Sequence, residues 1–181
     1  MQRQWVIQHG QDKIKILDLC TGSGAIAISL AKHIKNSELY ALDISEKALE
    51  ISKKNAKNND MKIHFIQSNL FQNLKEKDFD IIVSNPPYIR TEVIKTLSKE
   101  VQKEPIIALD GGEDGLYFYR KIIEKANEYL KPNGKIFLEI GFDQKCELME
   151  IMDTNFTNIK CVKDIAGLDR VIIGEIVCTT Y

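Results

Sequence analysis

The sequence predicts an α/β fold: a doubly wound, mostly parallel seven-stranded sheet that ends in an antiparallel hairpin. Three observations predict it. Short apolar runs of strand length alternate with segments of helical periodicity, as parallel strands and crossover helices do. Runs such as Ile81-Ile82-Val83 are apolar at successive positions, as in a strand that helices cover on both faces. The last two strand candidates are separated only by a turn signal, Gly167-Leu168-Asp169, which indicates antiparallel pairing.

The expected strands, in chain order, cover residues 13–19, 38–42, 62–66, 80–84, 135–140, 159–163 and 170–178. The expected helices cover residues 23–35, 46–57, 116–130 and 143–154. Ser45 is the expected N-cap of the second helix, because its hydroxyl can accept from a backbone amide of the first turn. The third helix has the strongest apolar stripe and ends at the turn signal Lys131-Pro132-Asn133-Gly134.

Length and charge narrow the classes of function. The chain has 181 residues, so we expect a single domain over residues 1–181. It carries 25 Lys and Arg residues against 26 Asp and Glu residues, a net charge of -1. That balance makes nucleic acid an unlikely partner, because a protein held on it by phosphate neutralisation is strongly basic, although it leaves room for a local basic patch.

The sequence pattern favours neither a membrane nor a metal. No stretch reaches the ~18 consecutive apolar residues of a membrane span, and the first residues lack the apolar region of a signal peptide. The four cysteines and three histidines lack the spacing of a metal site. We therefore expect reduced thiols in the core, no metal and a cytoplasmic location.

A glycine-containing loop joins the first expected strand to the first expected helix. Asp18 lies near the end of the strand, and the loop Cys20-Thr21-Gly22-Ser23-Gly24 opens the helix. Glycine permits a tight turn and a close approach of a ligand to the backbone. Asp43 ends the next strand, where a carboxylate can accept both hydroxyl hydrogens of a ribose. The pattern predicts a nucleoside-cofactor site, in which Asp18 either pairs with a cationic group of the cofactor or caps the amides of the loop.

The fourth expected strand ends in Asn85-Pro86-Pro87-Tyr88. Two prolines fix φ and remove two amide donors, so the loop is stiff, and it lies where ligands of open α/β sheets bind. The Asn85 side-chain oxygen and the Pro86 carbonyl can accept both hydrogens of a planar NH₂ group, while Tyr88 covers its face. Hydrogen bonds accepted from both N–H groups favour an electron-rich transition state at a nitrogen whose lone pair is delocalised, and they do so without a titratable base. We predict that Asn85, Pro86 and Tyr88 are catalytic and that these three and Pro87 bind the substrate.

These residues carry a resemblance. The chain resembles the catalytic domain of the Rossmann-like class I S-adenosylmethionine methyltransferases and, among them, the peptide chain release factor glutamine N5-methyltransferase family. The resemblance covers about residues 14–178. Adenine N6-methyltransferases share the Asn85–Tyr88 block, whereas Gly111-Gly112-Glu113-Asp114-Gly115-Leu116 and Ala166-Gly167-Leu168-Asp169-Arg170 point to the glutamine family. Further matching blocks are Asp43-Ile44-Ser45, Tyr119-Arg120 and Leu138-Glu139-Ile140-Gly141.

The resemblance implies S-adenosyl-L-methionine as the cofactor. It implies as substrate the glutamine of the Gly-Gly-Gln motif in class 1 peptide chain release factors. By position, the loop of residues 20–24 would bind the methionine portion of the cofactor and Asp43 its ribose. Asn69 and Leu70 would flank the adenine, and Asn85 would border both the cofactor and the glutamine amide, which the Asn85–Tyr88 loop would hold.

The sequence departs from the family pattern in two places. The family usually has an acid and an aromatic residue where Asn69 and Leu70 stand, which predicts weaker or rearranged adenine contacts. The helical N-terminal domain of the family, which helps to grip the release factor, is expected to be absent, because residues 1–13 are too few for it. Two alternatives stay open: an adenine N6-methyltransferase of nucleic acids, and a cofactor-binding domain without activity of its own. The oligomeric state is not predicted.

Overall fold

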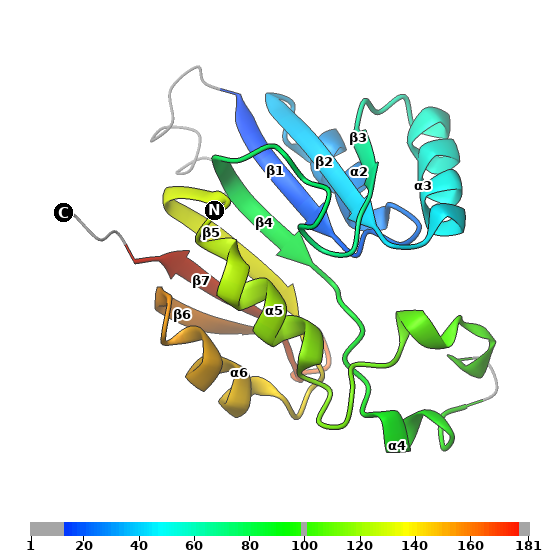
Figure 1. The fold of residues 1–181 in the computed structure, drawn as a ribbon, viewed down its shortest axis with the longest axis vertical. Coiled ribbons are helices and arrows are strands. Elements are labelled where there is room, and N and C mark those ends of the chain that lie inside the picture. Colours follow the sequence, from blue (N-terminus) through cyan, green and yellow to red (C-terminus); the bar gives the residue numbers. More distant parts are fainter. Residues whose placement is uncertain (1–12, 99–100, 178–181) are drawn as a thin grey trace.

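Seven strands form one mixed sheet in the computed structural model, which describes residues 13–98 and 101–177 (Figure 1). The strand order is β3-β2-β1-β4-β5-β7-β6. Strands β1 to β5 pair in parallel, whereas β7 is antiparallel to both β5 and β6. The predicted doubly wound sheet with an antiparallel C-terminal hairpin is therefore confirmed. The strands are β1 (Ile14–Leu19), β2 (Ser37–Asp43), β3 (His64–Gln67), β4 (Phe79–Ser84), β5 (Leu130–Glu139), β6 (Phe156–Lys163) and β7 (Asp169–Ile176).

The helices lie in the connections between the strands. They are α2 (Ala25–His33), α3 (Glu46–Asn58), α4 (Thr91–Ile94), α5 (Tyr117–Ala126) and α6 (Lys145–Met152), with short 3₁₀ turns at Val101–Lys103 and Ile106–Ala108. Ser45 caps α3 as expected, since its Oγ accepts from the amide of Ala48 at 3.3 Å. Within the described residues, no helix combines the length and the apolar character that crossing a membrane requires.

The two faces of the sheet carry separate cores. Alternate side chains of a strand point to opposite faces. Ile14 and Ile16 of β1 therefore pack with Leu30 of α2, whereas Leu17 and Leu19 belong to a larger core on the other face. That larger core includes residues of α5 and α6. The helices thus support the strands from two sides and leave the strand ends free to carry loops.

The connections differ from the sequence prediction more than the strands do. The helix expected to reach Leu130 ends at Ala126, and Leu130 begins β5. The predicted turn at residues 131–134 consequently lies inside β5, where the pairing with β4 shifts register between Phe79 and Ile81. Leu130 pairs with Phe79 in the sheet, so tertiary pairing overrides the helical periodicity of this residue.

The expectation of core cysteines is wrong for the three that the structure describes. Cys20 and Cys161 are partly exposed, Cys146 is exposed, and all three are free thiols. Cys146 lies on the solvent side of α6, whose core side presents Leu148 and Met152. Cys178 lies outside the described residues.

Candidate functional site

The four predicted site segments follow four adjacent strands that end at the same level. Leu19 is in register with Leu42 of β2 on one side and with Ser84 of β4 on the other. Leu42 is in turn in register with Ile66 of β3. The chain leaves β1 towards β2, and returns on its other side as β4, so β1 and β4 form the topological switch point where open α/β sheets bind ligands.

The loop after β1 is a tight turn in which its two glycines have different roles. Gly22 and Gly24 have φ values of 55° and 83°, in the left-handed region that favours glycine. In the part of the chain that the structure describes, nothing lies within 4 Å of a Cβ built on Gly22, so a ligand can approach the backbone there. A Cβ on Gly24 would lie 2.9 Å from the Cβ of Ser52, so Gly24 serves the packing of the loop on α3. Ser23 between them is exposed.

Asp43 is bonded directly to this loop. One carboxylate oxygen of Asp43 accepts the amide of Gly22 at 2.8 Å, and the other accepts the amide of Ser45 at 2.8 Å. Each carboxylate oxygen has two lone pairs, so both oxygens keep one acceptor position. The half-buried carboxylate thus shapes the loop and remains able to receive two hydroxyl hydrogens.

Asp18 is fully buried between β1 and α2. Its Oδ2 accepts from the Thr21 hydroxyl at 2.6 Å and from the Ala27 amide at 3.1 Å, whereas its Oδ1 has no hydrogen-bond partner among the described residues. Burial raises the pKa of this carboxyl from 3.8 to about 7, with a further contribution from the charge of Asp43. Both readings of Asp18 therefore have support: one oxygen caps the loop, and the other is an unsatisfied buried acceptor that a cation would satisfy.

Cys20 contributes to the site through the conformation of its backbone and not through the reactivity of its thiol. The residue has a φ of 59°, which a non-glycine residue rarely adopts. Desolvation, and then the nearby Asp43 charge, raise the pKa of its thiol to about 12. The thiol therefore stays protonated at neutral pH and is a poor nucleophile.

Asn69 and Leu70 follow β3 and lie beside the Asp43 strand end. The amide of Ser68 donates to the backbone oxygen of Asp43 at 2.9 Å, and the Ser68 hydroxyl donates to the oxygen of Leu70 at 2.6 Å. Leu70 has a φ of 50°, so the backbone turns sharply at this point. Asn69 is exposed and Leu70 is half-buried.

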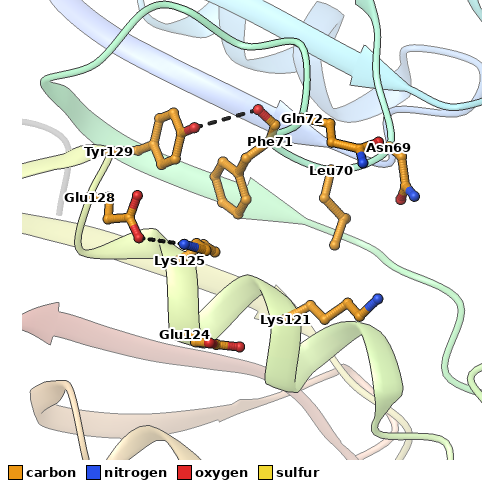
Figure 2. Close-up of a pocket in the computed structure, with 9 residues that line it drawn as sticks. All are labelled: Asn69, Leu70, Phe71, Gln72, Lys121, Glu124, Lys125, Glu128 and Tyr129. Atoms are coloured by element: carbon orange, nitrogen blue, oxygen red, sulfur yellow. Dashed lines mark hydrogen bonds and ion pairs between the residues drawn. The ribbon is translucent and has the colours of Figure 1, made fainter.

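A groove of about 370 Å³ lies between residues 69–72 and α5 (Figure 2). The rings of Phe71 and Tyr129 stack at one end, with centroids 4.5 Å apart. The opposite side, formed by α5 and the turn after it, carries two lysines and two glutamates, and among these Lys125 pairs with Glu128 at 2.7 Å. Asn69 and Leu70 therefore border this groove as well as the end of β2.

In the Asn85–Tyr88 loop, an exposed amide side chain is followed by two buried prolines. Asn85 is exposed, whereas Pro86 and Pro87 are buried and Tyr88 is half-buried. The Ser84 hydroxyl donates to the oxygen of Leu19 at 2.8 Å, which ties the start of the loop to the end of β1. Burial raises the pKa of the Tyr88 hydroxyl, as does Glu139, while Arg170 beside it acts in the opposite direction.

The segment of residues 109–115 holds the other end of this loop. The amide of Ile89 donates to the oxygen of Leu109 at 3.0 Å, and the amide of Gly111 donates to the oxygen of Ile89 at 2.8 Å. A Cβ on Gly111 would lie 2.7 Å from the Cα of Tyr88, and one on Gly115 would lie 2.5 Å from the oxygen of Tyr88. Two glycines are thus required because this segment packs directly on the Tyr88 backbone.

Sequence reasoning missed Gln144, which is buried beside Tyr88. Its Nε2 donates to the oxygens of Tyr88 at 3.0 Å and Gly115 at 3.2 Å. Its Oε1 accepts the amide of Gly141 at 2.9 Å. The only signal in the sequence was its position three residues after Gly141, the last residue of a matching block.

Arg170 connects the β6–β7 turn to the same region. Its Nη1 donates to the oxygen of Ile140 at 3.3 Å, and its Nε and Nη2 each lie 3.2 Å from Oδ2 of Asp164. Asp164 also accepts the amides of Ala166 and Leu168. The Ala166–Arg170 block therefore forms a stabilised turn beside Tyr88.

Sequence comparisons agree with the motifs. A family model described as the methyltransferase small domain matches residues 5–113. A release factor glutamine methyltransferase of Thermodesulfovibrio yellowstonii is 46% identical over 176 residues, 96% of this chain and 62% of that protein. A release factor glutamine methyltransferase of Agrobacterium fabrum is 46% identical over 162 residues, 87% of this chain and 56% of that protein. The resemblance drawn from the motifs is confirmed, although the chain spans less than two thirds of the length of these relatives.

Solved structures support the fold. A methyltransferase of Pyrococcus furiosus has a TM-score of 0.70 at 20% identity, covering 96% of this chain and 81% of that one. TrmN of Thermus thermophilus has a TM-score of 0.66 at 21% identity, covering 96% of this chain and 48% of that one. At this identity the likeness establishes the architecture and leaves the substrate open.

Proposed function

Because the chain belongs to the methyltransferase small-domain family, we propose that it transfers a methyl group from S-adenosylmethionine to the side-chain amide nitrogen of a glutamine. We place this glutamine in the Gly-Gly-Gln motif of a class 1 peptide chain release factor. The observation that carries the proposal is the exposed Asn85 on a stiff loop, one strand away from the open backbone of Gly22. Relatives that are 46% identical and carry the name release factor glutamine methyltransferase support the choice of substrate.

The cofactor would lie along the ends of β1, β2 and β3. S-adenosylmethionine supplies an electrophilic methyl group on a sulfonium. The loop of residues 20–24 would hold its methionine portion, and the buried Oδ1 of Asp18, which has no hydrogen-bond partner among the described residues, would accept from its ammonium group. Asp43 would accept the ribose hydroxyl hydrogens, and Asn69 and Leu70 would flank the adenine. The open space over Gly22 and the free acceptor positions of Asp43 fit such a ligand.

The Asn85–Tyr88 loop would hold the glutamine amide. An amide nitrogen is a weak nucleophile because its lone pair is delocalised into the carbonyl. Acceptance of its two N–H groups by the Asn85 side chain and the Pro86 carbonyl favours the pyramidal nitrogen of the transition state. The buried prolines keep these acceptors in place, so the reaction gains from positioning.

Tyr88 is proposed to pack against the substrate amide and to take no part in proton transfer. Its half-buried ring would cover one face of the planar amide by stacking. Because burial raises the pKa of its hydroxyl, Tyr88 stays protonated at neutral pH and is not a base. Asn85, Pro86 and Pro87 carry no titratable side chain, so the reacting proton leaves to solvent after transfer.

A protein substrate fits the charge distribution better than a nucleic acid. The lysines that form the most basic cluster of the sequence, Lys53, Lys54 and Lys57, lie on α3. That helix packs against β2 and β3, whereas the Asn85 loop follows β4 on the other side of β1. A basic track leading to Asn85 therefore has no support from this cluster. A release factor acts in translation, so the cytoplasm is the proposed location.

Labelled methyl transfer tests the proposal. The chain is incubated with S-adenosylmethionine carrying a labelled methyl group and with a purified class 1 release factor. We expect label at the glutamine of the Gly-Gly-Gln motif, and no label in a release factor in which that glutamine is replaced by alanine. Label that appears only when DNA or RNA is added would instead support the adenine alternative. No transfer to either class would contradict the proposal of an active enzyme.

A further inference from the structure

Gln144 is a buried amide that joins three segments of the chain. The residue is 4% exposed, at the start of α6. Its Nε2 donates to Tyr88 and Gly115, and its Oε1 accepts from Gly141. Both donor hydrogens and one acceptor position are therefore used, as expected of a buried amide.

Close packing around Gln144 holds its side-chain amide in one position. A Cβ on Gly115 would lie 2.7 Å from its Nε2, and a Cβ on Gly141 would lie 2.9 Å from its Oε1. The glycines of two separate segments thus make room for this one side chain. Such a fit holds the amide in a single orientation, so its hydrogen bonds fix the positions of the backbone groups to which they are made.

The Asn85–Tyr88 loop depends on anchors outside itself. Pro86 and Pro87 have no backbone N–H, so neither can donate a hydrogen bond that fixes the loop. Upstream, the Ser84 hydroxyl bonds to the oxygen of Leu19. Downstream, the first anchor after the prolines is the bond from Gln144 to the oxygen of Tyr88.

We propose that Gln144 is a positioning residue. Its hydrogen bond to the carbonyl oxygen of Tyr88 fixes the position of the Asn85–Tyr88 loop relative to the sheet. The proposal rests on the proposed function, because its kinetic consequence appears only if this loop holds the methyl acceptor. Gln144 is buried and bonds to Tyr88, Gly115 and Gly141, so its proposed effect on the reaction passes through Tyr88. Loss of its donor hydrogens displaces the acceptors of Asn85 and Pro86 while the cofactor end of the site stays intact.

Two variants separate this role from a general loss of stability. Gln144→Leu removes all three hydrogen bonds. Gln144→Glu is isosteric, keeps the acceptor for Gly141 and, once ionised, places a carboxylate against two carbonyl oxygens. Asn155→Leu is the matched control, since the Asn155 amide donates to the oxygen of Ile123 at 3.3 Å, near the other end of the strands.

Steady-state kinetics and calorimetry give the first readout. We expect kcat for methyl transfer to fall about 10- to 100-fold in Gln144→Leu, as for misplaced reacting groups, with the cofactor Kd changed less than about 2-fold. In Gln144→Glu the deficit in kcat relative to the parent chain should shrink as the pH falls, because the protonated carboxyl donates again. Asn155→Leu should keep the parent kcat. An unchanged kcat in Gln144→Leu, an equal loss in Asn155→Leu, or a pH-independent deficit in Gln144→Glu would each overturn the proposal.

Hydrogen exchange gives a second readout that needs no turnover. The amides of Ile89 and Gly111 bond across the loop and residues 109–111. Their exchange should become at least about 10-fold faster in Gln144→Leu, with exchange in β1 unchanged, and Asn155→Leu should leave them protected. Unchanged exchange overturns the positioning role. A parent chain that transfers no methyl group, yet shows this exchange pattern, contradicts the proposed function and leaves the loop anchor standing.

Discussion

The backbone amide of Gly22 donates to Oδ2 of Asp43 over 2.8 Å, so the glycine loop and the end of β2 form one bonded unit. Asp43 also receives the amide of Ser45, at the start of α3. A residue assigned only to a ribose is therefore also part of the scaffold of the cofactor site. A substitution of Asp43 therefore affects both the ribose contact and the hydrogen bonds that hold the loop.

Replacement of Asp43 by alanine should weaken cofactor binding. A hydrogen bond to a charged acceptor is worth about 1.5–3 kcal/mol, so we expect the Kd for S-adenosylmethionine to rise about 10- to 150-fold. Asp43→Asn keeps one acceptor oxygen and should lose less affinity. Isothermal titration calorimetry measures both variants, and an unchanged Kd in Asp43→Ala would contradict the assignment.

Replacement of Asn85 by alanine should lower turnover without loss of cofactor. The exposed side chain is assigned to the transition state, and removal of one such partner costs about 10²- to 10³-fold in kcat. The cofactor Kd should stay within about 2-fold, since the loop follows a different strand from Asp43. Asn127→Ala, an exposed asparagine after α5, serves as control. A parental kcat in Asn85→Ala would refute the role.

Replacement of Gly115 by alanine should displace the Tyr88 backbone. The new Cβ would lie 2.5 Å from the oxygen of Tyr88, and the φ of 76° adds strain. Gly167→Ala is a matched control, because its φ of 82° is similar and no described residue would lie within 4 Å of its Cβ. We expect Gly115→Ala to lose about 1–3 kcal/mol more stability than Gly167→Ala in urea unfolding. Equal losses in the two variants would show that the close approach to Tyr88 does not matter.

The pH dependence of stability should report the buried Asp18. Its pKa is raised from 3.8 to about 7 by burial, so the folded state binds this proton more tightly than the unfolded chain does. Its contribution to stability is therefore full below about pH 4 and is lost as the pH rises through about 7. Relative to Asp18→Asn, the parent chain should lose on the order of 1–4 kcal/mol between pH 4 and pH 8.

Asp114 provides the control for this measurement. The Arg120 guanidinium lowers the pKa of the Asp114 carboxyl to about 2, so its contribution is lost only as the pH falls through about 2. The pair is half exposed, so its contribution is small. The stability difference between the parent and Asp114→Asn should be nearly constant above about pH 5. A difference for Asp18→Asn that is equally flat, or that rises with pH, would contradict the buried, protonated Asp18.

The site segments were predictable because each lies where a strand ends. The loop after β1, Asp43 and the Asn85–Tyr88 loop all follow apolar runs whose boundaries the sequence shows to within a few residues. Since parallel strands end at one edge of a sheet, their proximity followed from the strand pattern alone. The roles of individual glycines did not follow. The sequence could not tell that Gly24 faces Ser52, because that contact lies between two different helical units.

The sequence by itself determined the class of fold, the edge at which the loops gather and the chemical groups that the loops carry. Local periodicity and short motifs contain this information, since each depends on residues close together in the chain. Only the tertiary structure decided the end of α5 at Ala126 and the burial of Gln144 against Tyr88. Gln144 and Tyr88 are 56 residues apart. Their contact depends on how β4, β5 and the intervening glycine segment pack, and no local pattern encodes that packing.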